Sequence, residues 1–404
     1  MANSLFSSEK KEETVFLFDI TSSSVGGSVV KFSKNREPVF IEVAREKIIG
    51  NSQLEPAKFF SSMVATLDKV TRDVAERGML KVTALRLKRP KTAFVVLSSP
   101  WCASDARVVF EKRKNPFTVT SEFLNQKIRA EEVSFENSLW SDGRANDHKK
   151  EIEVVERKVL NTRLNGYETP EPYGKEALEF FMTLIISVTS RTIAEKIRKV
   201  IEENLDIEQI ELHSFLMASF LSLREVAGDK NDFVFINVGG EDTEVMAIKK
   251  GTVTKTASFS QGRETLLRRT SAQLDNVPPH LVVSLLNEYA SGKDFSEKLK
   301  TAAEVATEAW RMELMAIFEK FSKEIFLPKD VFITTDRDTV SVFTFILKNM
   351  DMKELIFSDN PLNVKIVDEL FLKNQEQSDK ENHNDHFLAM EAVFLNSLWQ
   401  RRSV

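Results

Sequence analysis

Two stretches of the chain follow the same plan, and this duplication limits the fold more than any other feature of the sequence. In the first, the apolar segment VFLFDI reaches Asp19, a turn of small hydroxyl residues follows, and VGGSVVKFS continues. In the second, DFVFINV contains Asn237, GGEDT forms the turn, and EVMAIKKGTV continues. Asn237 lies 218 positions after Asp19 (237 minus 19). Apolar runs separated by small polar residues are typical of paired strands, so the pattern predicts a duplicated α/β fold in two lobes.

The segments around these two hairpins also repeat an order of strands and helices, judged by hydrophobic period. A loop is expected at 141–150 and a polar linker at 373–386. The expected strands cover 15–33, 38–48, 92–99, 106–113, 151–165, 232–253, 330–335 and 363–367. The expected helices cover 51–77, 120–132, 174–204, 213–226, 263–326 with a break at Pro278, 338–350, and an amphipathic segment at 387–404.

The bulk composition excludes several classes of function. Lys and Arg number 56 against 61 Asp and Glu, a net charge of -5, and we find no local basic patch, so nucleic acid is not an expected partner. Cys102 is the one cysteine, which excludes an internal disulfide and favours a reducing compartment. The apolar run at 180–188 is too short for a membrane span, and residues 1–14 do not read as a signal peptide. We therefore expect a cytoplasmic protein that could be peripheral at the inner face of the membrane.

A turn of small residues at the end of a strand suits the binding of phosphate, because backbone N–H groups and hydroxyls can approach an anion closely. An acidic residue such as Asp19 at the strand end can hold the water shell of Mg²⁺. One such turn is more often only a turn. Two at matching places in a duplicated chain, facing each other across a cleft, would hold one polyphosphate between the lobes.

The two hairpins also resemble those of a known superfamily. FDITSSSVGGSVV (18–30) and INVGGEDTEVMAIKKGTV (236–253) resemble the two phosphate motifs of the superfamily of actin, heat-shock chaperones and sugar kinases. SFSQGRETLLRRTSAQL (258–274) resembles the glycine-containing turn and helix that follow the second motif. The short link between the third strand and the first helix, and the extra region at 100–173, resemble the FtsA and PilM branch, which carries a small relocated domain (SHS2) there.

This resemblance implies a duplicated ribonuclease-H-like fold in two lobes with a small inserted α+β domain. Its expected parts are 1–99 (first part of lobe I), 100–173 (inserted domain), 174–228 (return of the lobe I helices), 229–372 (lobe II), 373–386 (linker) and 387–404 (C-terminal helix). It implies ATP with Mg²⁺ as cofactor, with Asp19 toward the metal. The nucleotide-binding positions that it implies are Asp19, Thr21, Ser22, Ser23, Asn237, Gly239, Gly240, Thr243, Gly262, Thr334 and Thr335.

Departures from the family pattern argue against a working nucleotide site. Thr21 stands where the first motif has glycine, and Gly26 stands where lysine is frequent, which removes a cation. Asn237 replaces an aspartate, and Glu241 follows where carboxylates would repel phosphate. The adenosine-binding Gly-Gly turn is replaced by Thr334, Thr335 and Asp336. These changes predict weak binding of ATP, or none, on a scaffold that has been kept.

Other residues capable of chemistry favour ordinary roles. Cys102 is expected to be a buried structural thiol, and the histidines are not at metal-ligand spacing. His383 and His386 fall in the polar linker and are expected to be solvated. The final segment, FLAMEAVFLNSLWQRR, either contacts a membrane through 387–402 or docks on protein, and the sequence leaves both open.

The resemblance leads to three functional hypotheses. The first is a cytoplasmic scaffold, at most a weak ATPase, whose residues 100–173 bind the tail of an inner-membrane protein. This is how PilM acts in type IV pilus assembly, and FtsA similarly links the cell-division ring to the membrane. The second is an active actin-like ATPase or sugar kinase, and the third is a filament or other homo-oligomer. The departures favour the scaffold, and the sequence does not separate the pilus role from the division role.

Overall fold

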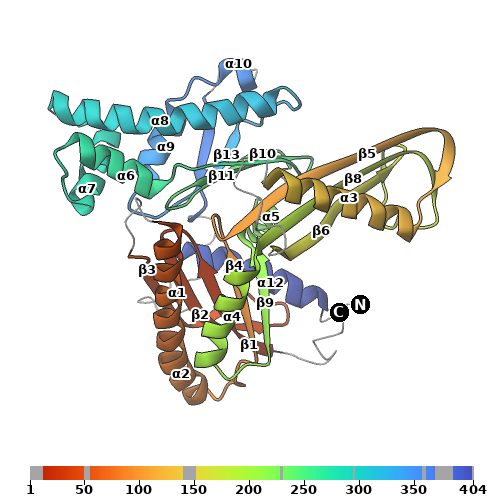
Figure 1. Ribbon diagram of the computed structural model, residues 1–404, viewed down its shortest axis with the longest axis horizontal. Coiled ribbons are helices and arrows are strands. Elements are labelled where there is room, and N and C mark those ends of the chain that lie inside the picture. The colour runs from red at the N-terminus through yellow and green to blue at the C-terminus, as the bar shows by residue number, and fades with distance from the viewer. Residues whose placement is uncertain are drawn as a thin grey trace.

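The computed structural model describes residues 12–49, 55–139, 152–227, 231–293, 296–356, 361–368 and 385–402. Two lobes lie one above the other in Figure 1, and a narrow extension projects from between them. The expected loop at 141–150 and most of the expected linker, 373–384, lie outside the described residues.

Lobe I is built on a five-stranded sheet in the order β3-β2-β1-β4-β9. The central strand β1 pairs antiparallel with β2 and parallel with β4, and its apolar residues are buried on both faces. One face packs on α1 and α4, and the other packs on α5 and on the C-terminal helix α12 (His386–Arg402). The bounds are β1 Glu12–Ile20, β2 Ser24–Ser33, β3 Val39–Lys47, α1 Pro56–Asp73, a π-helical segment Val74–Gly78, α2 Met79–Ala84, β4 Thr92–Leu97, α4 Arg191–Asn204, β9 Gln209–Ser214 and α5 Phe215–Val226.

Lobe II repeats this sheet, in the order β12-β11-β10-β13-β14. Its helices cover one face, and the opposite face joins the core that α5 and α12 form with lobe I. The matching strand orders confirm the expected duplication. The bounds are β10 Phe233–Val238, β11 Thr243–Lys249, β12 Thr252–Phe259, α6 Arg263–Gln273, α7 Pro279–Ala290, α8 Glu297–Ser322, β13 Asp330–Thr334, α9 Val340–Lys348, α10 Lys353–Ile356 and β14 Asn363–Ile366.

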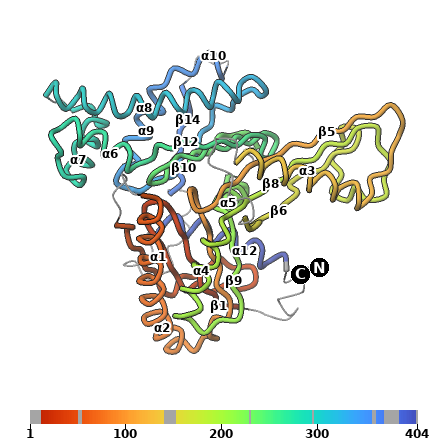
Figure 2. The backbone as a smooth tube through the Cα atoms, in the orientation of Figure 1, coloured from red at the N-terminus to blue at the C-terminus, as the bar shows by residue number. Residues whose placement is uncertain are grey.

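The inserted domain is a third sheet, in the order β5-β8-β6-β7, with α3 packed on one face. Figure 2 shows its strands running out together, away from both lobes. The bounds are β5 Cys102–Thr118, α3 Ser121–Leu139, β6 Ile152–Leu164, β7 Tyr167–Glu168 and β8 Glu176–Ser190.

The predicted helix at 174–204 is wrong in its first half, because residues 176–190 form strand β8. Every second residue from Phe180 to Val188 packs under α3, while Thr183 and Ile185 are buried on the opposite face. Burial on both faces produces a continuous apolar run, which hydrophobic period alone cannot distinguish from a buried helix. The boundary expected at residue 173 is wrong for the same reason, since the inserted sheet continues to Ser190.

Strand β9 was not predicted, and the helix expected at 213–226 begins at Phe215 instead. The side chain of Ser214 accepts a hydrogen bond from the N–H of Met217, which caps the helix start. The short strand is only partly buried, so its apolar pattern is weak.

Helix α12, His386–Arg402, docks on protein instead of presenting an apolar face outward. It packs against α5, β1 and β2, and its residues from His386 to Ala392 are buried. Of the two alternatives that the sequence left open for 387–402, membrane contact or docking on protein, the structure shows docking on protein. The amphipathic pattern expected for this helix is wrong in its first two turns, where every residue is buried. His386 is 4% exposed, so its expected solvation is also wrong. Over the described residues, no helix is both long and apolar enough to cross a bilayer.

Candidate functional site

The first turn connects β1 to β2, and most of its hydrogen bonds are made within the turn. The hydroxyl of Thr21 accepts hydrogen bonds from the N–H groups of Ser23 (3.2 Å) and Ser24 (3.0 Å). The carbonyl of Thr21 accepts one from the indole of Trp101 (2.8 Å). Such a side-chain turn uses N–H groups that a phosphate would otherwise bind. The residue that replaces the family's glycine is thus the one that closes the turn.

Asp19, at the end of β1, is fully buried and paired with an arginine that lies two strands away in the sheet. Arg45 on β3 reaches across Gly26 on β2, and its Nη2 lies 2.6 Å from Oδ2 of Asp19. A Cβ on Gly26 would lie 2.5 Å from that same nitrogen. The cation lost at position 26 is therefore replaced by Arg45, and glycine at 26 makes the space that Arg45 uses.

Asp385, directly before α12, and Glu391 within it complete this group, which we call the buried ionic cluster (Asp19, Arg45, Asp385 and Glu391). Arg45 Nε lies 2.5 Å from Oδ2 of Asp385, the residue that precedes the helix. Burial and the neighbouring charge of Asp19 raise the pKa of Glu391 well above its ordinary value. Burial also raises the pKa of Asp19, against the opposing effect of Arg45. The carboxylate of Asp19, which was expected to face Mg²⁺, is therefore engaged in an ion pair inside the protein.

The second turn, between β10 and β11, contacts the first turn directly. The hydroxyl of Ser22 accepts hydrogen bonds from the N–H groups of Gly240 (2.9 Å) and Glu241 (3.1 Å). A Cβ on Gly240 would lie 2.9 Å from Cβ of Ser23, so the two turns are in van der Waals contact. These backbone N–H groups are the ones that would hold a phosphate. A side chain of the first turn occupies them instead.

The backbone N–H groups at the start of α6 are also occupied by hydrogen bonds within the protein. The N–H groups of Arg263 and Glu264 donate to the carbonyls of Gly239 (2.8 Å) and Gly240 (2.7 Å). Gly262 is required there, because a Cβ would lie 2.4 Å from the carbonyl oxygen of Gly239. The helix N-terminus therefore packs on the second turn and offers these N–H groups to no anion.

The other predicted nucleotide-binding residues are buried in structural positions. Asn237 donates to Glu244 (3.0 Å), and burial raises the pKa of Glu244 to about 7. The hydroxyl of Thr243 accepts from the indole of Trp310 (2.9 Å). Thr334 and Thr335 are fully buried at the end of β13. None of these side chains borders the open space between the lobes.

That open space is a cavity of about 560 Å³ beside the two turns. Ser22 and Ser23 reach it from the first turn. Arg263 is 4% exposed and is held by Asp336, Asp338 and Glu264, so its charge is compensated within the protein. The ionised side chains that border the cavity are two cations, Lys47 and Arg263, and three carboxylates, Glu241, Glu264 and Asp338.

With two cations against three carboxylates, the charge around the cavity does not favour binding of a polyphosphate. Glu241 adds to it, although its carboxylate turns to Arg268 (2.7 and 2.9 Å) instead of filling a phosphate position as expected. Among the described residues, no group of three His, Cys, Asp or Glu side chains could hold a metal ion. The residues present do not fit Mg²⁺–ATP.

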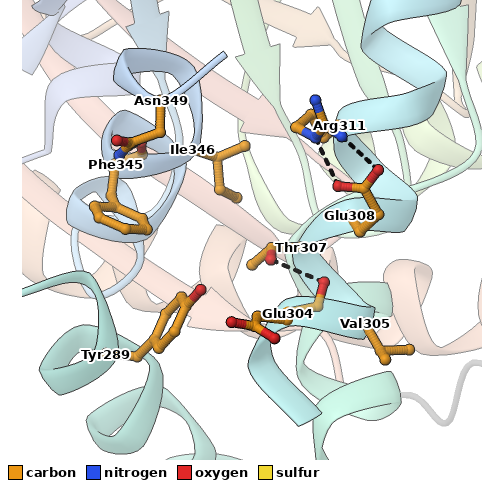
Figure 3. Close-up of a pocket in the computed structure, with 9 residues that line it drawn as sticks. All are labelled: Tyr289, Glu304, Val305, Thr307, Glu308, Arg311, Phe345, Ile346 and Asn349. Atoms are coloured by element: carbon orange, nitrogen blue, oxygen red, sulfur yellow. Dashed lines mark hydrogen bonds and ion pairs between the residues drawn. The ribbon is translucent and has the colours of Figure 1, made fainter. Parts of the chain in front are cut away.

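A second cavity, of about 480 Å³, lies in lobe II between α7, α8 and α9, away from the turns (Figure 3). The rings of Tyr289 and Phe345 meet edge to face at one side, and Arg311 pairs with Glu308 at the other. It contains none of the predicted site residues.

Sequence reasoning missed the residues that close the site. Arg45, Asp385 and Glu391 lie in segments with no motif, and Arg45 is 340 residues from Asp385. One signal was present, since a glycine replacing a frequent lysine at position 26 leaves Asp19 without a cation. That gap indicates a compensating cation elsewhere in the chain, and Arg45 on β3, next to Gly26, supplies it.

The fold and the pair of facing turns define a protein of the actin-like ATPase fold, with the small inserted domain after the fourth strand of lobe I. Among solved structures it is similar to PilM in the PilM-PilN type IV pilus biogenesis complex, with a TM-score of 0.61 and 13% identity over 96% of this chain and 98% of that chain.

Two further solved structures are more distant. One is a protein of unknown function with an actin-like ATPase fold from Bacteroides thetaiotaomicron (TM-score 0.45, 10% identity, covering 97% of this chain and 99% of that chain). The other is the ethanolamine utilization protein EutJ from Carboxydothermus hydrogenoformans (TM-score 0.45, 13% identity, covering 97% and 92%). No protein-family model and no curated protein matches the sequence.

Proposed function

We propose that this protein is a scaffold of actin-like fold that works by binding and not by turning over ATP. Its inserted domain binds a short segment of an inner-membrane protein, as a cytoplasmic component of a membrane assembly. A pilus-type assembly is favoured over a division-type one, because the tail that would support an FtsA-like role is buried as α12. The alternative is an active ATPase or a filament-forming protein of the same fold.

The observation that carries the proposal is the contact between the two turns. Ser22 caps the N–H groups of Gly240 and Glu241, where a phosphate would have to bind. Binding ATP there would require breaking these bonds and separating the two turns. A protein that functions by binding a partner loses nothing when this site closes.

The inserted domain supports the second half of the proposal. Its sheet is covered by α3 on one face only. On the other face Val108 and Phe110 are 45% and 60% exposed, and Phe110 lies opposite Phe181. β5 is also an edge strand, and exposed strand edges bind extended peptides. The similarity to PilM, solved in complex with PilN, suggests the same use of this domain.

The proposal that the protein does not work through ATP is tested by titration calorimetry of the full chain with Mg²⁺–ATP. We expect no saturable binding. The matched variant Ser22→Ala frees two N–H groups, so it should bind nucleotide no worse than the wild type. Sub-micromolar affinity in the wild type, reduced by Ser22→Ala, would show that Ser22 is a phosphate ligand and would favour the active ATPase.

The proposal that the inserted domain binds a membrane-protein segment is tested by photocrosslinking. A benzophenone side chain at position 110 should form an adduct with one membrane protein in cells of the source organism. The same group at position 305, which is 50% exposed on α8, is the control. Equal adducts from both positions, or adducts only with soluble proteins, would refute binding of a membrane-protein segment by the inserted domain.

A further inference from the structure

At the end of lobe I that is farthest from lobe II, one segment is rich in basic residues, although the chain as a whole carries a charge of -5. This end is formed by α2 and the segment that leads to β4, at the bottom of Figure 1. Residues 77–104 contain no Asp or Glu. We call the following six residues the basic end: Arg77, Lys81, Arg86, Lys88, Arg89 and Lys91. The expectation that the chain lacks a local basic patch is therefore wrong.

Half of these cations are already compensated. Arg77 and Lys81 pair with the buried carboxylate of Glu42 (3.4 and 2.7 Å). Lys91 lies 3.5 Å from Asp206 and from Glu208. In contrast, within the described part of the chain no ion pair involves the three basic residues that remain. These are Arg86, Lys88 and Arg89, and all three are exposed.

Two leucines stand among these free cations. Leu80 is 73% exposed and Leu85 is 58% exposed, while their neighbour Val82 turns inward and is buried. Leu85 is the C-cap residue of α2, and Arg86, with φ of 54°, turns the chain directly after it. Exposed leucines next to unpaired cations form a surface that is both apolar and positively charged.

We propose that the basic end binds the anionic surface of a lipid bilayer. Unpaired Lys and Arg are attracted to anionic headgroups, and exposed leucines can enter the boundary between headgroups and acyl chains. The leucines favour a lipid surface over an acidic protein, which would need the cations alone. The surface lies apart from the inserted domain (Figure 1), so lipid contact and partner binding can occur together.

The test is co-sedimentation of the full chain with vesicles. We expect binding to vesicles that contain phosphatidylglycerol, none to phosphatidylcholine alone, and weakening as salt rises. The triple variant R86Q/K88Q/R89Q should lose affinity roughly 100-fold, from the contribution of each cation near an anionic surface. The variant L80S/L85S should bind these vesicles several-fold more weakly than the wild type, and its binding should still weaken as salt rises. All five side chains are exposed, so both variants should fold.

The control is K293Q/K298Q/K300Q, which removes three exposed lysines with acidic partners from the α7–α8 end of lobe II. This variant should bind vesicles like the wild type. The proposal is overturned if the wild type does not sediment with phosphatidylglycerol vesicles, or if the control loses as much affinity as R86Q/K88Q/R89Q. Binding to polyglutamate without binding to vesicles would also overturn it, and would assign the basic end to an acidic protein. None of these results depends on whether the inserted domain binds a partner.

Discussion

Gly26 and Arg45 act as one unit, although neither is notable alone. The guanidinium of Arg45 fits over the position where Gly26 lacks a side chain, and from there it reaches both Asp19 and Asp385. Arg45 is half-buried and Asp19 is fully buried, and such an ion pair stabilises the fold only while all partners stay in place. The cluster therefore locks the first turn to the C-terminal helix.

Gly26→Ala should destabilise the protein by roughly 2–3 kcal/mol, because the new methyl group displaces Arg45 and leaves buried charges unpaired. Urea unfolding measures the effect. In an Arg45→Met background the same change should cost much less, since the displaced group is already absent. Additive effects of the two substitutions would contradict this coupling.

Glu391→Gln tests whether the buried carboxyl is neutral. The folded pKa of Glu391 lies above the ordinary 4.5, so the folded state binds more protons and stability falls as pH rises above that value. Glutamine has no proton to lose, so the variant should be more stable than the wild type at pH 7 by on the order of 1–2 kcal/mol. The difference should vanish near pH 4. Glu313→Gln, at an exposed position on α8, should show no such pH-dependent gain.

At the scale of elements, α12 is the least expected part of the structure. It follows lobe II in sequence, yet packs on lobe I, where Phe394 is buried against the ring of His213 with centroids 5.2 Å apart. Its apolar residues, which could suggest a lipid-binding tail, are core residues. The helix belongs to the folding unit and is not an appendage.

Phe394→Ala should therefore cost about 3–5 kcal/mol, as expected for a large side chain removed from a core. Chemical denaturation followed by tryptophan fluorescence measures it. Arg401→Ala, on the exposed end of the same helix, should change stability by less than about 0.5 kcal/mol. A loss below about 1 kcal/mol for Phe394→Ala would show that α12 contributes little to the core.

The sequence predicted most elements because β1, β2, β10 and β11 have clear apolar runs between small polar turns. It failed at β8, where burial on both faces hid the strand period, and at β9, which is short and half-buried. For the site, it located the two turns and the departures at Thr21 and Gly26. It could not show that the turns touch, because the contact of Ser22 with Gly240 spans 218 residues and depends on how the lobes close.

At the scale of the whole molecule, the inserted domain is joined to lobe I through a buried polar network. His213 on β9 lies 3.0 Å from Glu156 on β6, and Ser214 joins Ser187 of β8 (2.9 Å). Burial disfavours charged His213, but hydrogen bonds with Glu156 and Glu211 outweigh it and raise its pKa to about 9. The ion pair between the two parts is thus present at neutral pH.

Because this pKa is raised above 6.5, the stabilisation is complete below pH 6.5 and is lost as pH rises toward 9. We expect the free energy of unfolding to fall by about 2–3 kcal/mol across this interval. His213→Gln should be less stable at pH 6 and lack most of that decline. A wild-type stability that stays flat from pH 6.5 to 9 would contradict a charged His213.

The position of α12 also bears on how the chain folds during synthesis. Gln400 donates to the carbonyl of Ser33, 367 residues earlier, and Trp399 stacks on Phe32. Until the ribosome has delivered residues 386–402, one face of the first sheet lacks this cover and its apolar side chains stay accessible. Contacts over such long separations form slowly, and uncovered apolar surface promotes aggregation. Newly made lobe I should therefore depend on chaperones until residues 386–402 have been synthesised and have packed on it.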